Sequence, residues 1–272
     1  IKNLGHIIGL HSHTHPMILE KFSYKEQLKQ YTNNLNIISS ILKCKTTDII
    51  SMSHPCGSYN INTIATNNLV TVDISKSEEI NKMVKNILKI YGHIDILINN
   101  AFYNPNQSKS SAAGFEKFPI ELWNDVLKVN LTGVFLCCQS IGKVMIKQNN
   151  GVIINISSIY GMIGADQRIY GSSGLNSPVS YAASKGAIIN LTRYLAAYWR
   201  GKNIRVNSLS LGGVEDKKYM SKEFIKNYSN KTILNRMAKK NEYNAAILFL
   251  ASDASSYMSG SNLIIDGGWT AW

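Results

Sequence analysis

Short, nearly continuous apolar runs recur along the chain from about residue 69. Such runs are typical of strands that are buried on both faces of a sheet. They lie at residues 69–73, 94–99, 151–157, 204–209 and 262–266. Longer segments with an apolar residue every three or four positions predict helices between them. These lie at residues 77–91, 119–148, 178–200 and 241–252. Strands that alternate with helices indicate an α/β fold with a parallel sheet covered on both faces.

The first part of the chain has a similar but shorter pattern. Apolar runs at residues 5–10 and 48–53 predict two strands, and residues 23–42 predict a helix between them. Ser23 at the N-cap and Glu26 three residues later form a capping box, which supports that helix start. This segment is therefore a predicted strand–helix–strand unit.

Histidine separates the two parts of the chain. Five of the six histidines lie in the first 54 residues, and a Val- and Ile-rich alternation begins near residue 69. We place a junction at about residues 60–69. The predicted division is therefore residues 1–68 and residues 69–272.

Composition excludes several classes of protein. The net charge is +12, but the lysines are scattered among Asn and Ser without a basic tract, so no nucleic-acid partner is expected. No run of about 18 apolar residues exists, so no transmembrane helix is expected. The N-terminus has a poor signal-peptide pattern, and the four cysteines have neither disulfide-framework nor C-x-x-C spacing, so a cytoplasmic protein with reduced thiols is expected.

Tyr181 and Lys185 stand four residues apart in the helix predicted at residues 178–200, in the run Ser-Tyr-Ala-Ala-Ser-Lys-Gly. Residues at this spacing lie on one face of a helix. A neighbouring positive charge favours the phenolate and lowers the pKa of the phenol toward neutrality. The pair therefore predicts a proton donor and acceptor for the interconversion of an alcohol and a ketone.

Three further motifs accompany this pair in order along the chain. The triplet Asn-Asn-Ala that begins at Asn99 ends one strand, Asn130 lies within a long helix, and Ser158 ends another strand. Together with Tyr181 and Lys185 they resemble the short-chain dehydrogenase/reductase family, from about residue 69 to the end of the chain. The resemblance implies a doubly wound, Rossmann-like parallel sheet and an NAD(P)-dependent oxidoreductase.

Catalytic roles follow from that resemblance. It implies that Tyr181 is the general acid/base and that Lys185 lowers its pKa and holds the nicotinamide ribose. It implies that Ser158 hydrogen-bonds the substrate carbonyl and that Asn130 supports a proton-relay water. Ser158 is preferred to Ser157 because it stands at the family position just before the turn Ile-Tyr-Gly.

The resemblance also implies cofactor contacts, with NAD and NADP both left open. Asp73 matches the acidic residue that contacts adenine, and Asn100 belongs to the segment that stabilises the sheet beside the cofactor. The full set of implied cofactor positions is Asp73, Asn99, Ala101, Tyr181, Lys185, Gly212 and Val214.

Two features depart from the family pattern. The family's Pro-Gly pair reads Leu211-Gly212 here, which loosens the turn expected to orient the nicotinamide carboxamide near Val214. The glycine-rich phosphate loop is absent, since no G-x-x-x-G-x-G occurs before residue 69. We therefore expect a sheet that lacks its usual first two βα units.

Three features narrow the resemblance to one group of reductases within this family. They are a lengthened stretch at residues 164–178, Phe102 in place of a glycine, and the C-terminal run at residues 266–272. They are similar to reductases of flagellin-modification and nonulosonic-acid pathways. The implied substrate is a sugar or nucleotide sugar in surface-glycan biosynthesis. Helix pairing through residues 120–147 and 178–200 implies a homo-oligomer by family analogy.

The N-terminal runs beginning at His11 and Ser53 resemble two motifs of the polysaccharide deacetylase (NodB-like) family over about residues 1–62. By that resemblance His11 and His15 are metal ligands, with zinc as the usual ion. Two histidines without a carboxylate make a weak, open site. The alternative functions are therefore a zinc-dependent carbohydrate deacetylase fragment and an inactive fusion relic.

Loss of the first two units would leave an apolar parallel edge on the strand at residues 94–99, and such an edge favours aggregation. The strands at residues 5–10 and 48–53 offer nearly the topology that is missing. We predict that they dock against this edge.

Overall fold

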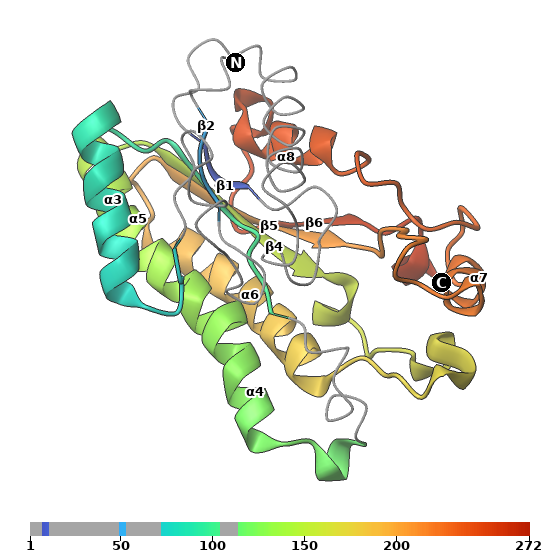
Figure 1. Ribbon diagram of the computed structural model, residues 1–272. Helices are drawn as coiled ribbons and strands as arrows, with labels where there is room; N and C mark the ends of the chain where they lie inside the picture. The colour runs from blue at the N-terminus through green and yellow to red at the C-terminus, as the bar shows by residue number, and fades with distance from the viewer. Residues whose placement is uncertain (1–6, 11–48, 53–71, 104–113) are drawn as a thin grey trace.

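The computed structural model describes residues 7–10, 49–52, 72–103 and 114–272 of the chain (Figure 1). These residues form one parallel sheet of six strands in the order β2-β1-β3-β4-β5-β6. The strands are β1 (Ile7–Leu10), β2 (Ile49–Met52), β3 (Ile96–Asn99), β4 (Gly151–Ser158), β5 (Ile204–Leu211) and β6 (Asn262–Ile265).

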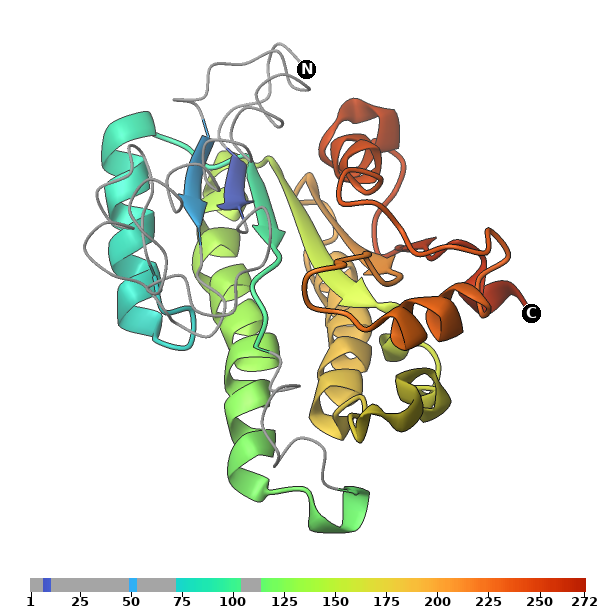
Figure 2. The same cartoon turned by 45° about the vertical axis from the view of Figure 1, so that its right-hand side comes forward.

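Helices cover both faces of this sheet, as Figure 2 shows from a second side. The helices are α3 (Ser77–Tyr91), α4 (Ile120–Leu127), α5 (Val134–Gln148), α6 (Val179–Tyr198), α7 (Lys222–Ser229) and α8 (Asn244–Ala251). A π-helical turn, Lys128–Gly133, joins α4 and α5 without a break. Every helix predicted from the periodicity of residues 72–272 is confirmed, whereas α7 was not predicted.

Two apolar layers follow from the alternation of side chains along the strands. Leu97, Ile153 and Val206 point toward α3, α5 and α6 and join their buried residues in one cluster. Ile154 and Leu209 point to the other face and pack with the apolar residues of α8. The strands are therefore buried on both sides, as their continuous apolar runs predicted.

The N-terminal strands belong to the same sheet. β1 pairs with β3 in the register Ile7↔Ile96, and β2 pairs with β1 on its other side. The prediction that these strands dock against the apolar edge of β3 is confirmed. The sheet therefore does not lack strands beside β3, because the N-terminal segment supplies two of them.

One predicted helix lies outside the described residues, and one predicted strand is not found in the part of it that is described. The helix predicted at residues 23–42 lies outside the described residues. Of the strand predicted at residues 69–73, only Val72 and Asp73 are described, and neither belongs to a strand. Asp73 instead begins the turn that leads into α3.

The run Ile120–Gln148 is long and apolar enough to cross a membrane by length and composition alone. It lies against the sheet beside α3 and α6, and Ile141 and Met145 of α5 are fully buried there. Its other side carries the exposed residues Lys143 and Lys147. This is the pattern of a core helix in an α/β sheet.

Candidate active site

The predicted catalytic residues meet at the carboxyl end of the central strands. Asn99 ends β3 and Ser158 ends β4, while Tyr181 and Lys185 lie in the first turns of α6, which packs on β4 and β5. In parallel α/β sheets ligands bind outside this edge. The sequence placed these residues far apart, and the fold brings them together.

Ser157 and Ser158 have different roles. The Ser157 hydroxyl donates to the carbonyl oxygen of Lys185 at 2.8 Å, which ties β4 to α6. Ser158 shares a hydrogen bond with the side chain of Tyr181. The alternation of side chains along β4 separates the two, and it supports Ser158 as the residue that faces the phenol.

The pKa of Tyr181 is raised, not lowered as predicted. Burial raises it by disfavouring the phenolate, and the hydrogen bond with Ser158 opposes this effect. The Lys185 ammonium lies over the phenol ring, 5.7 Å from its centroid, and it does not offset this rise. In this arrangement Tyr181 is a neutral phenol that holds its proton.

The Lys185 side chain is buried, with 4% of its surface exposed. Its ammonium donates to the carbonyl oxygen of Ile156 at 2.8 Å and lies 5.6 Å from the centre of the Phe102 ring. Burial lowers the pKa of Lys185 to about 8. One of its three N–H groups is used among the described residues, so two remain for a ligand hydroxyl.

Asn130 lies in the π-helical turn and is also buried. Its side-chain oxygen accepts from the Tyr103 N–H at 2.6 Å, and its side-chain nitrogen donates to the Tyr103 carbonyl at 3.0 Å. The same nitrogen lies 3.5 Å from the Ser184 hydroxyl, which donates to the carbonyl of Tyr181. Both ends of the amide thus hold the chain that follows β3 against the π-helical turn.

The segment that follows β3 carries Phe102, an aromatic residue at the position where the short-chain dehydrogenase/reductase pattern has a glycine. Its ring meets the ring of Tyr181 edge to face, with centroids 6.2 Å apart. Lys185 lies near both rings. Asn130, through Tyr103, therefore positions an aromatic wall beside the proton donor.

A buried polar chain crosses the sheet beneath this wall. Asn99 donates to Asn155 at 2.8 Å, and Asn155 donates to the Thr192 hydroxyl of α6 at 2.9 Å. Asn100 and Ala101 follow Asn99 and are half-buried. The expectation that this segment stabilises the sheet fits the bond from Asn99 to the neighbouring strand.

Gly212 and Val214 lie just beyond the end of β5. A Cβ atom on Gly212 would come within 2.8 Å of the Asp266 backbone, so only glycine fits here. The carbonyl of Gly212 accepts from the Tyr243 hydroxyl at 2.9 Å, and Val214 forms a parallel bridge with Ala238. The turn expected to be loose without proline is thus held from two sides.

Asp73 makes its contacts with residues of its own turn. Its carboxylate accepts from the Ser75 N–H at 3.0 Å and from the Ser75 hydroxyl at 2.7 Å, and Lys76 lies 3.4 Å away. These bonds lower its pKa, although burial acts in the opposite direction. Asp73 therefore orders the turn before α3, and its predicted contact with adenine stays a prediction.

Sequence reasoning missed two residues in the turn after β4. Tyr160 follows Ser158 by two positions, and its hydroxyl is buried without a hydrogen-bond partner among the described residues. A Cβ atom on Gly161 would come within 2.7 Å of the backbone of Lys185, so the turn packs directly on α6. The glycine in the run Ile-Tyr-Gly is the sequence feature that could have indicated this close approach.

The predicted metal ligands His11 and His15 lie outside the described residues. Within the described parts of the chain, no group of three His, Cys, Asp or Glu side chains could hold a metal ion. The zinc site stays a prediction.

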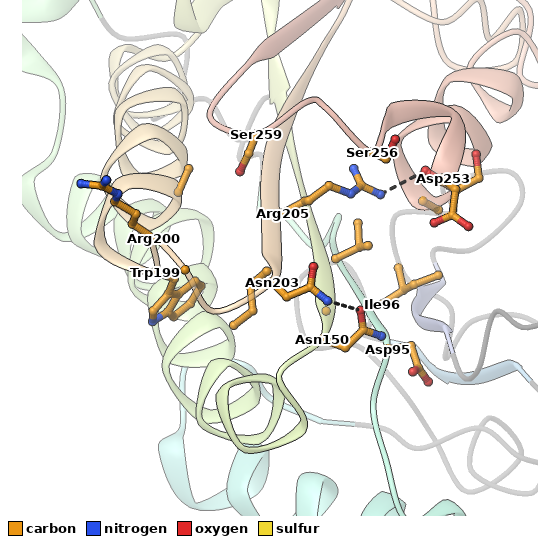
Figure 3. A pocket seen from close by; sticks show the side chains of 17 residues that line it. Asp95, Ile96, Asn150, Trp199, Arg200, Asn203, Arg205, Asp253, Ser256 and Ser259 are labelled. Atoms are coloured by element: carbon orange, nitrogen blue, oxygen red, sulfur yellow. Dashed lines mark hydrogen bonds between the residues drawn. The ribbon is translucent and has the colours of Figure 1, made fainter.

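A hollow of about 500 Å³ lies at the opposite end of the sheet, where β3, β4 and β5 begin (Figure 3). Its polar groups largely make hydrogen bonds to other groups of the protein. Arg205 donates to the carbonyl oxygens of Leu250 and Ser252 at the end of α8, each at 3.1 Å. This hollow is distant from Tyr181 and contains none of the predicted catalytic residues.

Known proteins resemble this chain over most of its length. A family profile described as "Enoyl-(Acyl carrier protein) reductase" matches residues 58–270. A 3-oxoacyl-[acyl-carrier-protein] reductase from Thermotoga maritima is 36% identical over 199 residues, which are 72% of this chain and 74% of the relative. An NAD-dependent glycerol dehydrogenase from Listeria innocua is 37% identical over 206 residues, 73% of each chain.

A solved structure extends the likeness to the N-terminal part. A short chain dehydrogenase from Leptospira borgpetersenii, with bound NAD+, has a TM-score of 0.74 and 30% identity. The alignment covers 98% of this chain and 93% of that one. The sheet that includes β1 and β2 therefore has the architecture of that enzyme.

Proposed function

This chain belongs to the short-chain dehydrogenase/reductase family of oxidoreductases, and on that premise we propose that it interconverts a carbonyl and an alcohol on a polyhydroxylated, sugar-like substrate, with NAD or NADP. The observation that carries the proposal is the junction of Ser158, Tyr181 and Lys185 at the carboxyl end of the sheet. A relative named as a glycerol dehydrogenase supports the polyol class. A nucleotide sugar of a surface-glycan or flagellin-glycan pathway is the narrower form of this proposal.

The described residues fit the nicotinamide half of such a cofactor. Lys185 has two N–H groups that can donate to ribose hydroxyls, and the Gly212 turn lies just beyond the end of β5, close against the Asp266 backbone. Asn99, Ala101 and Val214 flank the same edge. The bound cofactor supplies or accepts the hydride.

The chain's own residues handle the proton. Tyr181 donates a proton to the carbonyl oxygen of the substrate during reduction and takes it back during oxidation. Ser158 donates a hydrogen bond to the same oxygen and stabilises the charge that develops there. Lys185, as a nearby cation, favours the phenolate once a ligand draws the ammonium from above the ring toward the hydroxyl. Asn130 positions the Phe102 wall.

An acyl-thioester ketone is the second candidate substrate. The relative from Thermotoga maritima is named for 3-oxoacyl-[acyl-carrier-protein] reduction, at an identity similar to that of the glycerol dehydrogenase. The catalytic residues serve both classes, because both reactions reduce a ketone. The choice depends on the groups that surround the reacting carbon.

Two alternative proposals remain: a zinc-dependent carbohydrate deacetylase fragment in the first part of the chain, and an inactive fusion relic as the state of the whole chain. His11 and His15 would carry the deacetylase activity with zinc. β1 and β2 pair with the oxidoreductase sheet, which favours a structural role for this segment in one fold. In this proposal, residues 1–68 and 69–272 have different evolutionary origins and contribute to a single sheet.

We also propose a homo-oligomer. Tyr194 and Tyr198 of α6 stack at 5.8 Å with 62% and 70% of their surface exposed, and Phe135 of α5 is exposed too. Exposed aromatic residues on adjacent helices are typical of subunit interfaces. Sedimentation of Tyr198→Glu should show smaller particles than sedimentation of the wild type.

Titration of the purified chain with NADH and NADPH tests the main proposal, followed by turnover assays with a polyol and with an acetoacetyl thioester. We expect saturable binding of at least one cofactor and turnover of the polyol. Tyr181→Phe should keep cofactor binding and lose about 10²–10⁴-fold in kcat. A folded chain that binds neither cofactor would leave the relic as the correct alternative.

A further inference from the structure

The ring of Tyr160 packs in an apolar cluster with Ile169, Tyr228 and Trp269. Its hydroxyl oxygen is buried and has no hydrogen-bond partner within the described residues. Buried polar groups in native proteins nearly always have a partner, and an exception calls for an explanation. The position of Tyr160, two residues after Ser158, points to a ligand as the missing partner.

The backbone fixes Tyr160 relative to the catalytic residues. Its N–H donates to the Ser158 hydroxyl oxygen at 3.3 Å, and the next residue, Gly161, packs on the backbone of Lys185 without room for a Cβ. Tyr181 also acts electrostatically on the Tyr160 phenol. Tyr160 is therefore held at a set place beside the proton donor.

Neighbouring polar groups do not satisfy this hydroxyl. The Asp166 carboxylate binds Arg168 and Lys231, each at 2.8 Å. The Tyr228 hydroxyl accepts from the Gly213 N–H. Neither group makes a hydrogen bond with the Tyr160 hydroxyl, so we look for its partner outside the described residues.

An aromatic cluster surrounds Tyr160. Its ring meets the Trp269 ring edge to face at 6.5 Å, and Trp269 packs at 4.4 Å on Tyr228 of α7. Burial raises the pKa of Tyr160, so the phenol stays neutral and can both donate and accept. An aromatic surface with one neutral hydroxyl suits a molecule that has an apolar face and several hydroxyl groups.

We propose that Tyr160 is a specificity-determining residue whose phenol hydrogen-bonds a hydroxyl of the substrate beside the reacting carbon. The inference rests on the proposed function and selects its polyol form over the acyl-thioester form, which offers no hydroxyl there. Phe224, Ile225 and Tyr228 of α7 pack in the same cluster as Tyr160, so access requires α7 to shift outward. The contacts of Glu223 on α7 with Ser172, at 3.1 and 3.4 Å, lie on the surface and yield readily.

Tyr160→Phe removes only the hydroxyl, and two alcohols report on its role. Glycerol and propan-2-ol share an oxidisable central carbon, but propan-2-ol lacks the neighbouring hydroxyl groups. We expect Tyr160→Phe to lower kcat/KM for glycerol about tenfold and to leave that for propan-2-ol unchanged. Equal losses on both alcohols, or no loss on either, would overturn the inference.

Thermal unfolding without ligand provides a second test. Loss of a hydroxyl that has no partner should leave the Tm of Tyr160→Phe equal to or above that of the wild type. Tyr170→Phe is the matched control, because the Tyr170 phenol shares a hydrogen bond with Ser177 in the same region. Its Tm should fall while its preference for glycerol over propan-2-ol remains.

A lower Tm for Tyr160→Phe, similar to that of Tyr170→Phe, would mean that the phenol has a partner within the protein and would overturn the inference. If the wild type turns over an acetoacetyl thioester and no polyol, the polyol form of the proposed function and the inference both fail. If polyols are turned over equally well by Tyr160→Phe, the inference alone fails.

Discussion

The two ends of the parallel sheet differ in how far the protein satisfies its own polar groups. At the amino end, Arg205 lines a hollow but donates to three acceptors, the carbonyls of Leu250 and Ser252 and the hydroxyl of Ser255. At the carboxyl end, Lys185 uses one donor and the Tyr160 hydroxyl uses none. A cavity is thus a poorer guide to chemistry than buried polar groups that are short of partners.

Neighbouring serines provide the strongest test of the carboxyl end. Ser158→Ala should lower kcat/KM about 10²–10³-fold, because it removes a donor to the oxygen of the substrate. Ser157→Ala should mainly lower the free energy of unfolding, by about 1 kcal/mol, because it removes the bond to the Lys185 carbonyl. Steady-state kinetics and urea unfolding of both variants measure this, and equal kinetic losses would contradict the assignment.

Asn130 tests whether the aromatic wall matters. Asn130→Ala leaves the N–H and carbonyl of Tyr103 without their side-chain partner, so the free energy of unfolding should fall by about 1–3 kcal/mol. Displacement of Phe102 beside Tyr181 should lower kcat about tenfold. Retained kcat with lost stability would reduce Asn130 to a purely structural residue.

The pH dependence of unfolding tests whether the Lys185 ammonium is buried at the carboxyl end of the sheet. Its pKa is lowered to about 8 from 10.5, so the unfolded chain binds more protons between these two pH values. The free energy of unfolding of the cofactor-free wild type should therefore rise with pH across this window, by about 3 kcal/mol. Lys185→Met should lack that rise. Parallel pH slopes of the two proteins in urea unfolding would show that the ammonium is not buried.

Arg205 gives the smallest expected effect on activity. Arg205→Met removes the bonds that hold the end of α8, and the free energy of unfolding should fall by about 1–3 kcal/mol. Kinetic constants of the folded variant should equal those of the wild type. A changed KM for the cofactor or the substrate would show that the amino end takes part in function.

Periodicity was sufficient to predict the elements that carry the site. α3 begins and ends at the predicted residues, and α6 and β5 differ from the prediction by about two residues, because their buried faces are continuous. α7 was missed, although Ser221 is a readable N-cap that accepts from the N–H of Phe224. Phe224, Ile225 and Tyr228 form its apolar face, but the helix is only eight residues long, too short for its periodicity to stand out.

The sequence could predict that these residues meet at one edge of the sheet, but it could not predict their contacts. Spacing indicated that Lys185 lies near Tyr181, yet only the structure shows that the ammonium turns to the carbonyl of Ile156. Burial raises the pKa of Tyr181, and the hydrogen bond with Ser158 opposes this effect. Likewise, nothing in the run Ile-Tyr-Gly shows that the hydroxyl of Tyr160 lacks a partner.

The π-helical turn at Lys128–Gly133 sets the rotation between two halves of one helix. A wide turn holds about one residue more than an α-helical turn, and one residue rotates an α-helix by about 100°. Deletion of a single residue in this turn would restore an even helix and rotate α5 by that angle. Ile141 and Met145 would then leave the core, so the chain length of this turn is fixed by the sheet as much as by Asn130.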